Sequence, residues 1–278
     1  MIYLLLAIAS SALVSIIMRL STDRVKGNVS MLAMNYLMCV GVSAVYTGLG
    51  ELLPKSPALP QTLGMGLIHG ALYLGSFLLL QLNVKRNGVV LSATFMKLGL
   101  LVPMVLSIAV FGEMPGVSQI VGFLIAIAAI VLMNMEKDST LMQFKSGLIL
   151  LLIGGGAGDA MSKVFEELGD RNLSDQFLFY TFVAAFVLCI ALMLYQKQIP
   201  GGAEIFWGFL IGIPNFFSAK FLLRSLMDVP AVVAYPTYSV ATMLVITLAG
   251  VLLFRERLGK CQWGALGMIL VALGLLNL

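Results

Sequence analysis

Apolar residues fill ten long runs of the chain, and short polar or Gly/Pro-containing segments separate them. Each run is long enough to cross about 30 Å of hydrocarbon as a helix, because an α-helix rises about 1.5 Å per residue. The pattern predicts an all-α integral membrane protein with ten transmembrane helices. The predicted spans are 2–20, 30–50, 61–82, 88–111, 117–135, 145–168, 175–196, 203–225, 229–254 and 260–278.

The composition strengthens this prediction. Hydrophobic residues make up 60% and charged residues 11% of the 278 residues, and a soluble protein of that composition would expose large apolar patches to water. The three cysteines, Cys39, Cys189 and Cys261, lack metal-binding or redox spacing, and no basic patch with interleaved aromatic residues is present. We therefore expect no metal, no cofactor and no nucleic-acid partner.

An internal repeat relates the two halves of the sequence. The segment FGEMPGVSQ (111–119) matches FRERLGKCQ (254–262) at Phe, Glu, Gly and Gln, and all four pairs are 143 residues apart. Further matches, in nearly the same register, extend from the second span to the fifth. The register predicts a first five-helix repeat over residues 1–140 and a second over residues 141–278.

The number of spans in each repeat fixes how the two copies cross the membrane. Each repeat holds five spans, an odd number, so the second copy enters from the side opposite to the first. An inverted repeat of this kind is typical of secondary transporters, in which exchanging the conformations of the halves opens a site to opposite sides. No GxxxxGK[ST] segment is present, so an ion or solute gradient is the expected energy source.

With FGE (111–113) and FRE (254–256) ending the fourth span of each half, the sequence resembles the EamA-like branch of the drug/metabolite transporter superfamily over its whole length. The fourth span of the first half, SATFMKLGLLVPMVLSIAVFGE, carries a proline as that family does, whereas the second half has Pro236 at a different place. The resemblance implies small-molecule transport through a central cavity, not an enzyme, and leaves the cargo open.

Lysine and arginine are distributed unevenly between the two sides of the membrane. Cytoplasmic loops carry an excess of these residues, so the richer set marks the cytoplasmic side. The bias predicts a multi-pass protein of the cell (inner) membrane with both termini extracytoplasmic, although the resemblance implies cytoplasmic termini. Three lysines and arginines follow even-numbered spans, namely Lys55, Arg171 and Arg224. Eleven lysines and arginines follow odd-numbered spans, namely Arg19, Arg24, Lys26, Lys85, Arg86, Lys137, Lys145, Lys197, Arg255, Arg257 and Lys260.

The stretch GGGAGDAMSK (154–163) places an acid and a base inside a predicted span. A charge at the bilayer centre costs about 3 kcal/mol, so both side chains are expected to face the bundle interior. The spacing of four puts Asp159 and Lys163 on one helix face. Either the pair neutralises itself, with Glu167 as a third member, or it binds cargo or exchanges a proton. The glycines before it let a helix or a ligand approach the backbone closely.

Several other polar residues are candidates for contacts with a substrate. Lys97 stands ten residues into its span and either needs an anion or snorkels to the interface. His69 shares a face with Tyr73 and is either a packing residue or a proton relay. Interhelical hydrogen bonding is the alternative for the neutral groups. The full set of predicted substrate-binding residues is Asn35, His69, Tyr73, Lys97, Asp159, Lys163, Asn215, Tyr235 and Tyr238.

These patterns predict a secondary active transporter of a small polar metabolite, either amino-acid-like or organic-anion-like. Its expected partners are this substrate, the lipid bilayer and a coupling proton or sodium ion. A non-transporting membrane receptor is the alternative. An intramembrane aspartyl protease fits less well, because GAGD (156–159) matches its GxGD motif but the chemistry needs two carboxylates. The remaining aspartates lie at helix ends or in loops, namely Asp23, Asp138, Asp170, Asp175 and Asp228.

Overall fold

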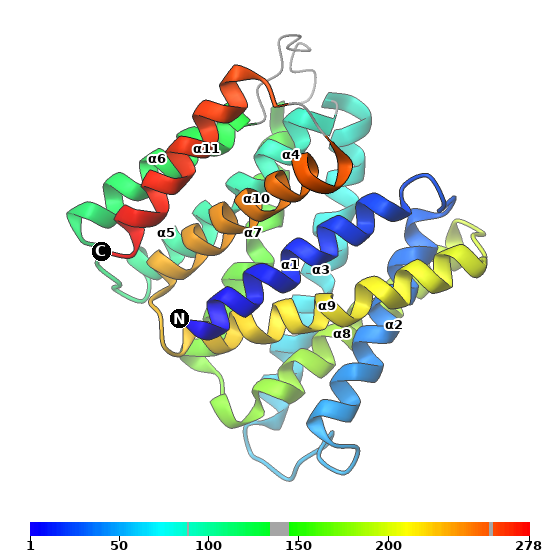
Figure 1. The fold of residues 1–278 in the computed structure, drawn as a ribbon. Coiled ribbons are helices and arrows are strands. Elements are labelled where there is room, and N and C mark those ends of the chain that lie inside the picture. Colours follow the sequence, from blue (N-terminus) through cyan, green and yellow to red (C-terminus); the bar gives the residue numbers. More distant parts are fainter. Residues whose placement is uncertain (88, 134–144, 256–257) are drawn as a thin grey trace. The chain divides into compact units, whose positions relative to one another are not determined.

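The structure of the chain is a computed structural model (Figure 1), and it describes residues 1–87, 89–133, 145–255 and 258–278. Within those ranges the chain forms α-helices and two short 3₁₀ helices, with no strand. In chain order the elements are α1 (Ile2–Ser21), α2 (Asn28–Thr47), α3 (Leu59–Asn87), α4 (Val89–Lys97), η1 (Leu98–Leu100), α5 (Leu101–Ala109), α6 (Val117–Met133), α7 (Lys145–Leu168), η2 (Arg171–Leu173), α8 (Ser174–Tyr195), α9 (Gly202–Leu226), α10 (Ala231–Phe254) and α11 (Lys260–Leu276).

These helices account for the ten predicted spans. Within the described ranges, eight apolar stretches are long enough to cross a membrane, and α6 and α11 are shorter apolar helices of 17 residues each. The helices α4, η1 and α5 follow one another without a loop and together make the fourth span. The prediction of an all-α multi-pass membrane protein with ten transmembrane helices is therefore confirmed.

The fourth span changes from α to 3₁₀ geometry over Leu98–Leu100. Pro103 lies four residues after Gly99, so it offers no N–H to the carbonyl of Gly99, and its ring crowds that carbonyl. Lys97 is the last residue of α4 and stands directly before the change. The proline noted in the sequence thus explains an irregular backbone beside a candidate charge.

The chain divides into two compact units. Unit 1 consists of Met1–Leu74 and Val164–Ser225, and unit 2 consists of Gly75–Lys163 and Leu226–Leu278. Each unit takes segments from both halves of the sequence, so the compact units and the predicted repeats are different divisions of the chain.

The boundary predicted between the repeats, at residues 140 and 141, lies outside the described residues. Glu256 of the FRE segment lies outside them as well. The five-plus-five inverted repeat therefore stays a prediction.

Close helix packing in unit 1 depends on small residues. Helices α2 and α8 pack side by side (Figure 1). Helix α3 approaches α8 through two glycines one turn apart: a Cβ added at Gly66 would lie 2.8 Å from the Cβ of Tyr180, and one added at Gly70 would lie 2.6 Å from the Cβ of Ala184. Larger side chains would push these helices apart.

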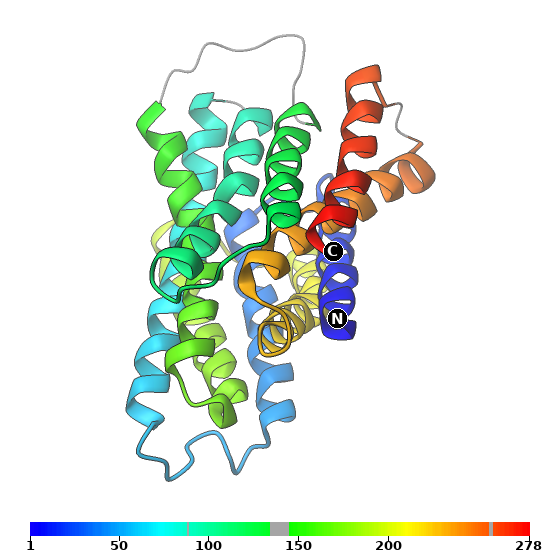
Figure 2. The same ribbon diagram turned by 90° about the vertical axis from the view of Figure 1, so that its left-hand side faces the viewer.

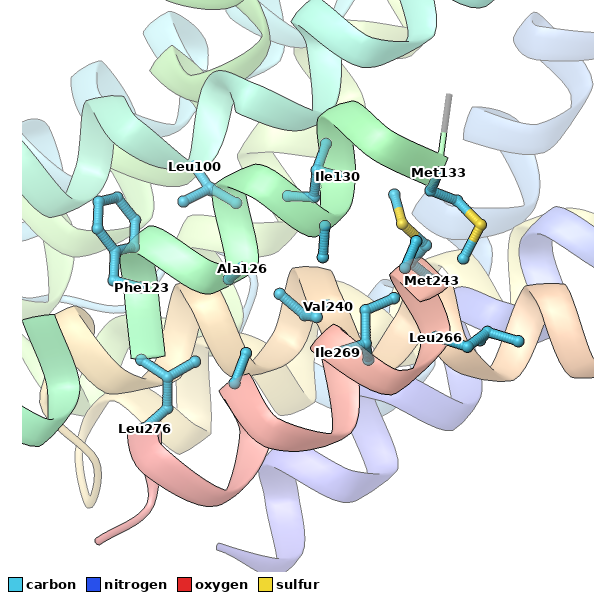
Figure 3. Packing of buried hydrophobic residues seen from close by; sticks show 13 residues of the cluster. Leu100, Phe123, Ala126, Ile130, Met133, Val240, Met243, Leu266, Ile269 and Leu276 are labelled. Carbon is cyan, nitrogen blue, oxygen red and sulfur yellow. The ribbon is translucent and has the colours of Figure 1, made fainter. Parts of the chain in front are cut away.

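Unit 2 contains an apolar core formed by α6, α10 and α11. Helices α6 and α11 lie beside each other (Figures 1 and 2), and a Cβ added at Gly122 near the start of α6 would lie 2.9 Å from the Cβ of Leu275 near the end of α11. Figure 3 shows Ile130 of α6 and Ile269 of α11 within this core, together with Val240 of α10. All three are fully buried.

Candidate functional site

Unit 2 brings together acidic and basic side chains from two spans and one connection. Lys97 ends α4, Asp159 and Lys163 lie on α7, and Glu113 lies in the connection between α5 and α6. Apart from Lys163, which is buried, these residues are partly buried. Ionised groups in such surroundings require partners of opposite charge or hydrogen bonds.

Lys163 forms an ion pair with Glu113. The Lys163 Nζ lies 2.8 Å from the Glu113 Oε1, and the two side chains are 2% and 15% exposed. The same carboxylate accepts hydrogen bonds from the backbone N–H groups of Ala231 at 3.2 Å and Val232 at 3.0 Å, the first two residues of α10. Because the N-terminus of a helix carries a partial positive charge, one carboxylate neutralises both a lysine on α7 and the start of α10.

Asp159 has a different set of contacts. Its carboxylate interacts electrostatically with the ammonium group of Lys97. Its backbone carbonyl accepts a hydrogen bond of 2.6 Å from the hydroxyl of Tyr235, a residue of α10 that is 1% exposed. Two cross-links therefore join α7 to α10: Lys163 reaches Ala231 through the Glu113 carboxylate, and the Asp159 carbonyl bonds to Tyr235 directly. They are one helical turn apart, because four residues separate the two positions on each helix.

Glycines explain how Lys97 comes close to Asp159. A Cβ added at Gly99 would lie 2.8 Å from the backbone nitrogen of Gly156, and one added at Gly155 would lie 3.3 Å from the carbonyl oxygen of Met96. The backbones of the fourth span and of α7 are therefore almost in contact. The close approach predicted from the GGGAG stretch is thus confirmed, with a helix as the neighbour.

Unit 1 places His69 in a stack of aromatic rings. The His69 ring lies 4.5 Å from the Tyr73 ring and 5.3 Å from the Phe177 ring, between centroids. The Thr181 hydroxyl lies 3.3 Å from the Nδ1 of His69 and also donates a hydrogen bond of 2.8 Å to the carbonyl of Phe177. Since that hydroxyl has one proton, we infer that Nδ1 carries the imidazole proton. The Nε2 is then an acceptor, buried and without a hydrogen-bond partner among the residues that the structure describes.

A second polar group of unit 1 joins α2 to α9. The Asn215 side-chain amide donates a 3.2 Å hydrogen bond to the side-chain carbonyl of Asn35, and the Cys39 thiol donates a 3.2 Å hydrogen bond to the carbonyl of Gly212. Gly212 permits this contact, because a Cβ there would lie 2.6 Å from the Cβ of Met38. Helical packing therefore positions both asparagines.

The structure sorts the predicted residues into separate groups. Unit 2 brings Lys97, Asp159, Lys163 and Tyr235 into one network, and Tyr238 follows on α10 and is partly buried. Unit 1 pairs Asn35 with Asn215 and, separately, His69 with Tyr73.

Sequence reasoning missed the role of Glu113, which it used only as a repeat marker. It also missed Thr181 and Phe177, the neighbours of His69. The distance along the chain from His69 to Thr181 is 112 residues, and helical spacing gives no signal over such a distance. For Glu113, the signal was present in part, because an acid in a connection between spans is well placed to meet the N-terminus of another helix.

The second half of the sequence matches a known family of transporters. Residues 146–278 match the sequence model of the EamA-like transporter family. The predicted resemblance to EamA-like transporters is therefore confirmed for the second half of the chain, and it indicates a membrane transporter.

One relative and one solved structure are similar to nearly the full length of the chain, and a second relative is similar to half of it. An uncharacterized protein of Haemophilus influenzae is 25% identical over 280 residues, which cover 96% of this chain and 93% of that protein. An uncharacterized transporter of the same organism is 28% identical over 148 residues, covering 50% of this chain and 45% of that protein. A protein crystal structure shares the fold with a TM-score of 0.74 and 15% identity, covering 99% of this chain and 94% of that one.

Proposed function

We propose that the chain is a secondary active transporter that moves a small polar metabolite across the cell membrane by alternating access. The close contact between the fourth span and α7 is the main support, because it brings the span that carries the base Lys97 against the helix that carries the acid Asp159. Lys97 also adjoins the irregular turn over Leu98–Leu100, where backbone groups are less regularly bonded. Irregular helices beside charges are a common way to build substrate sites in transporters.

The charges of unit 2 limit the cargo that fits. Lys97 and Lys163 balance Asp159 and Glu113, so this network is neutral without a substrate. A zwitterion of the amino-acid type can place its carboxylate on Lys97 and its ammonium group on Asp159 without adding net charge. An organic anion would bind Lys97 alone and would bring a compensating proton or sodium ion. We propose one of these two substrate classes, with a proton or sodium ion as the coupling ion.

Neutral polar groups of each unit are proposed as further hydrogen-bonding groups for a substrate. In unit 2, Tyr235 and Tyr238 lie three residues apart on α10, and the hydroxyl of Tyr235 already reaches the backbone of Asp159. Within unit 1, considered by itself, the proposed groups are the amides of Asn35 and Asn215 and, next to Tyr73, the Nε2 of His69, which has no hydrogen-bond partner among the described residues.

Flux into vesicles that contain only this protein tests the proposal. Asp159→Asn removes the acid without changing its size, and Lys97→Met removes the base while keeping its apolar stem. We expect both variants to insert and fold, and to lose most of the flux of radiolabelled amino acids or carboxylates. Lys85→Met, at an exposed position near the end of α3, is the matched control and should transport normally. Normal flux through Asp159→Asn would contradict the assignment of this residue to the substrate.

A membrane receptor is the second candidate function, and the wild-type protein distinguishes the two. If a broad panel of metabolites raises the melting temperature of the purified protein but none enters the vesicles, the chain binds without transporting. Ligand binding to the native state raises the melting temperature whether or not transport follows. We propose the inner membrane as the location, with both termini on its extracytoplasmic side.

A further inference from the structure

Lys220 of α9 occupies a distinct charged environment in unit 1. Its Nζ lies 2.5 Å from the Oδ1 of Asp175, the second residue of α8. It also lies 3.5 Å from the centroid of the Tyr46 ring near the end of α2. One ammonium group is therefore held by a carboxylate and by the face of an aromatic ring.

The partners of Lys220 are more exposed than the lysine itself. The Lys220 side chain is 16% exposed, whereas the side chain of Asp175 is 36% exposed, and Tyr46 is 53% exposed. Phe216 and Phe217 of α9 contact the Tyr46 ring, with centroids 6.0 Å and 6.4 Å away, and support its orientation. The surface that recognises the ammonium group is thus built from α2 and α8, and the group itself comes from a flexible side chain of α9.

A carboxylate beside an aromatic face is a general recognition site for ammonium ions. The ring attracts the cation through its quadrupole, and the carboxylate supplies the counter-charge. A carboxylate also accepts more than one donor, and the recorded ion pair uses Oδ1 of Asp175. We propose that Asp175 and Tyr46 form a binding site for organic ammonium ions, which Lys220 fills as a tethered ligand until a cation from solution displaces it.

A thermal-shift titration with methylammonium chloride tests this site directly. Lys220→Met removes the tethered cation but keeps the apolar stem, so the variant should melt at a lower temperature than the wild type. Methylammonium should then restore the melting temperature of the variant, and sodium chloride at the same concentration should not. The apparent dissociation constant of the variant should be at least about tenfold lower than that of the wild type, where the solute must compete with Lys220. Lys55→Met, at an exposed loop position, is the matched control and should behave as the wild type does.

Two further variants assign the effect to the proposed groups. Asp175→Asn combined with Lys220→Met should abolish the response to methylammonium, because the carboxylate is gone. Tyr46→Leu combined with Lys220→Met should weaken it, because the ring face is gone. If Lys220→Met unfolds cooperatively, at whatever temperature, but methylammonium has no effect beyond that of sodium chloride, the site does not exist.

A labelling experiment on the wild-type protein gives an independent answer should Lys220→Met fail to fold. Tetramethylammonium cannot itself be acylated, and by displacing Lys220 it should increase the rate at which an amine-reactive ester modifies that lysine, as measured by peptide mass spectrometry. The modification of Lys55 should not change. An unchanged rate at Lys220 up to saturating tetramethylammonium would show that the lysine is a permanent structural partner, and would overturn the proposal.

Discussion

Replacing Glu113 by glutamine is expected to destabilise the protein more than its partly exposed position suggests. The substitution removes the carboxylate from Lys163, which is 2% exposed, while the amide oxygen that remains can still accept one backbone N–H from α10. Breaking a buried ion pair from one side typically costs about 3–5 kcal/mol, because the charge left behind has lost its compensation. We expect a loss of about 3 kcal/mol in the free energy of unfolding.

Replacing the other member of the ion pair, Lys163, should lower the free energy of unfolding by less. Lys163→Met leaves Glu113 with its two backbone N–H donors and with 15% exposure to solvent, so we expect a loss of about 1 kcal/mol. The double variant removes both charges, and we expect a loss of about 1 kcal/mol, mainly from the weaker interaction with the start of α10. The coupling energy of the double-mutant cycle would then be about 3 kcal/mol.

Equilibrium unfolding of the purified protein in mixed micelles of increasing denaturing-detergent content gives the four free energies. Glu51→Gln, in an exposed connection, serves as the control for the chemical change and should lie within about 0.5 kcal/mol of the wild type. A Glu113→Gln variant as stable as this control would refute the reasoning, because the ion pair at 2.8 Å would then contribute nothing to the fold.

Three further outcomes are expected. Gly70→Leu should lower the melting temperature strongly, since its Cβ would lie 2.6 Å from that of Ala184. Gly64→Leu should have little effect, since its Cβ would meet no described atom within 4 Å outside its chain neighbours and its own helix backbone. Fragments 1–140 and 141–278 expressed separately should not melt cooperatively, because each compact unit needs segments from both; a cooperative melt of either alone would contradict this. A reporter that functions only in the cytoplasm, fused to Leu278, should be inactive, and activity there would show that the lysine and arginine bias misleads for this chain.

The positions of the spans could be predicted from the sequence because the bilayer requires a minimum length of apolar helix. The eighth span was predicted as 203–225 and α9 covers Gly202–Leu226. Agreement is poorer where a helix continues past the apolar run: the third span was predicted as 61–82, but α3 extends to Asn87. Hydropathy locates the part of a helix that lies in hydrocarbon, and polar residues beyond it can still form helical hydrogen bonds.

The partners of the charged residues could be predicted only within one helix. A spacing of four placed Asp159 and Lys163 on the same face of α7, but the recorded ion pair of Lys163 is with Glu113, far away in the sequence. The sequence predicts Asn35 and Asn215 as substrate-binding residues without relating one to the other, and their hydrogen bond joins residues 180 positions apart. Contacts of this kind depend on how the helices pack, which in this chain depends on glycines such as Gly99 and Gly156.

The separate partners of Asp159 and Lys163 suggest different roles for two neighbouring charges. Because Lys163 and Glu113 neutralise each other, the proposed exchange of Asp159 and Lys97 with a cargo would not leave Lys163 uncompensated. The Glu113 pair also holds the first turn of α10, so breaking it would disturb the helix that carries Tyr235. We therefore expect Glu113→Gln to reduce stability more than flux per folded molecule, and Asp159→Asn to do the reverse. Equal effects of the two substitutions on both quantities would mean that the four charges act as one unit.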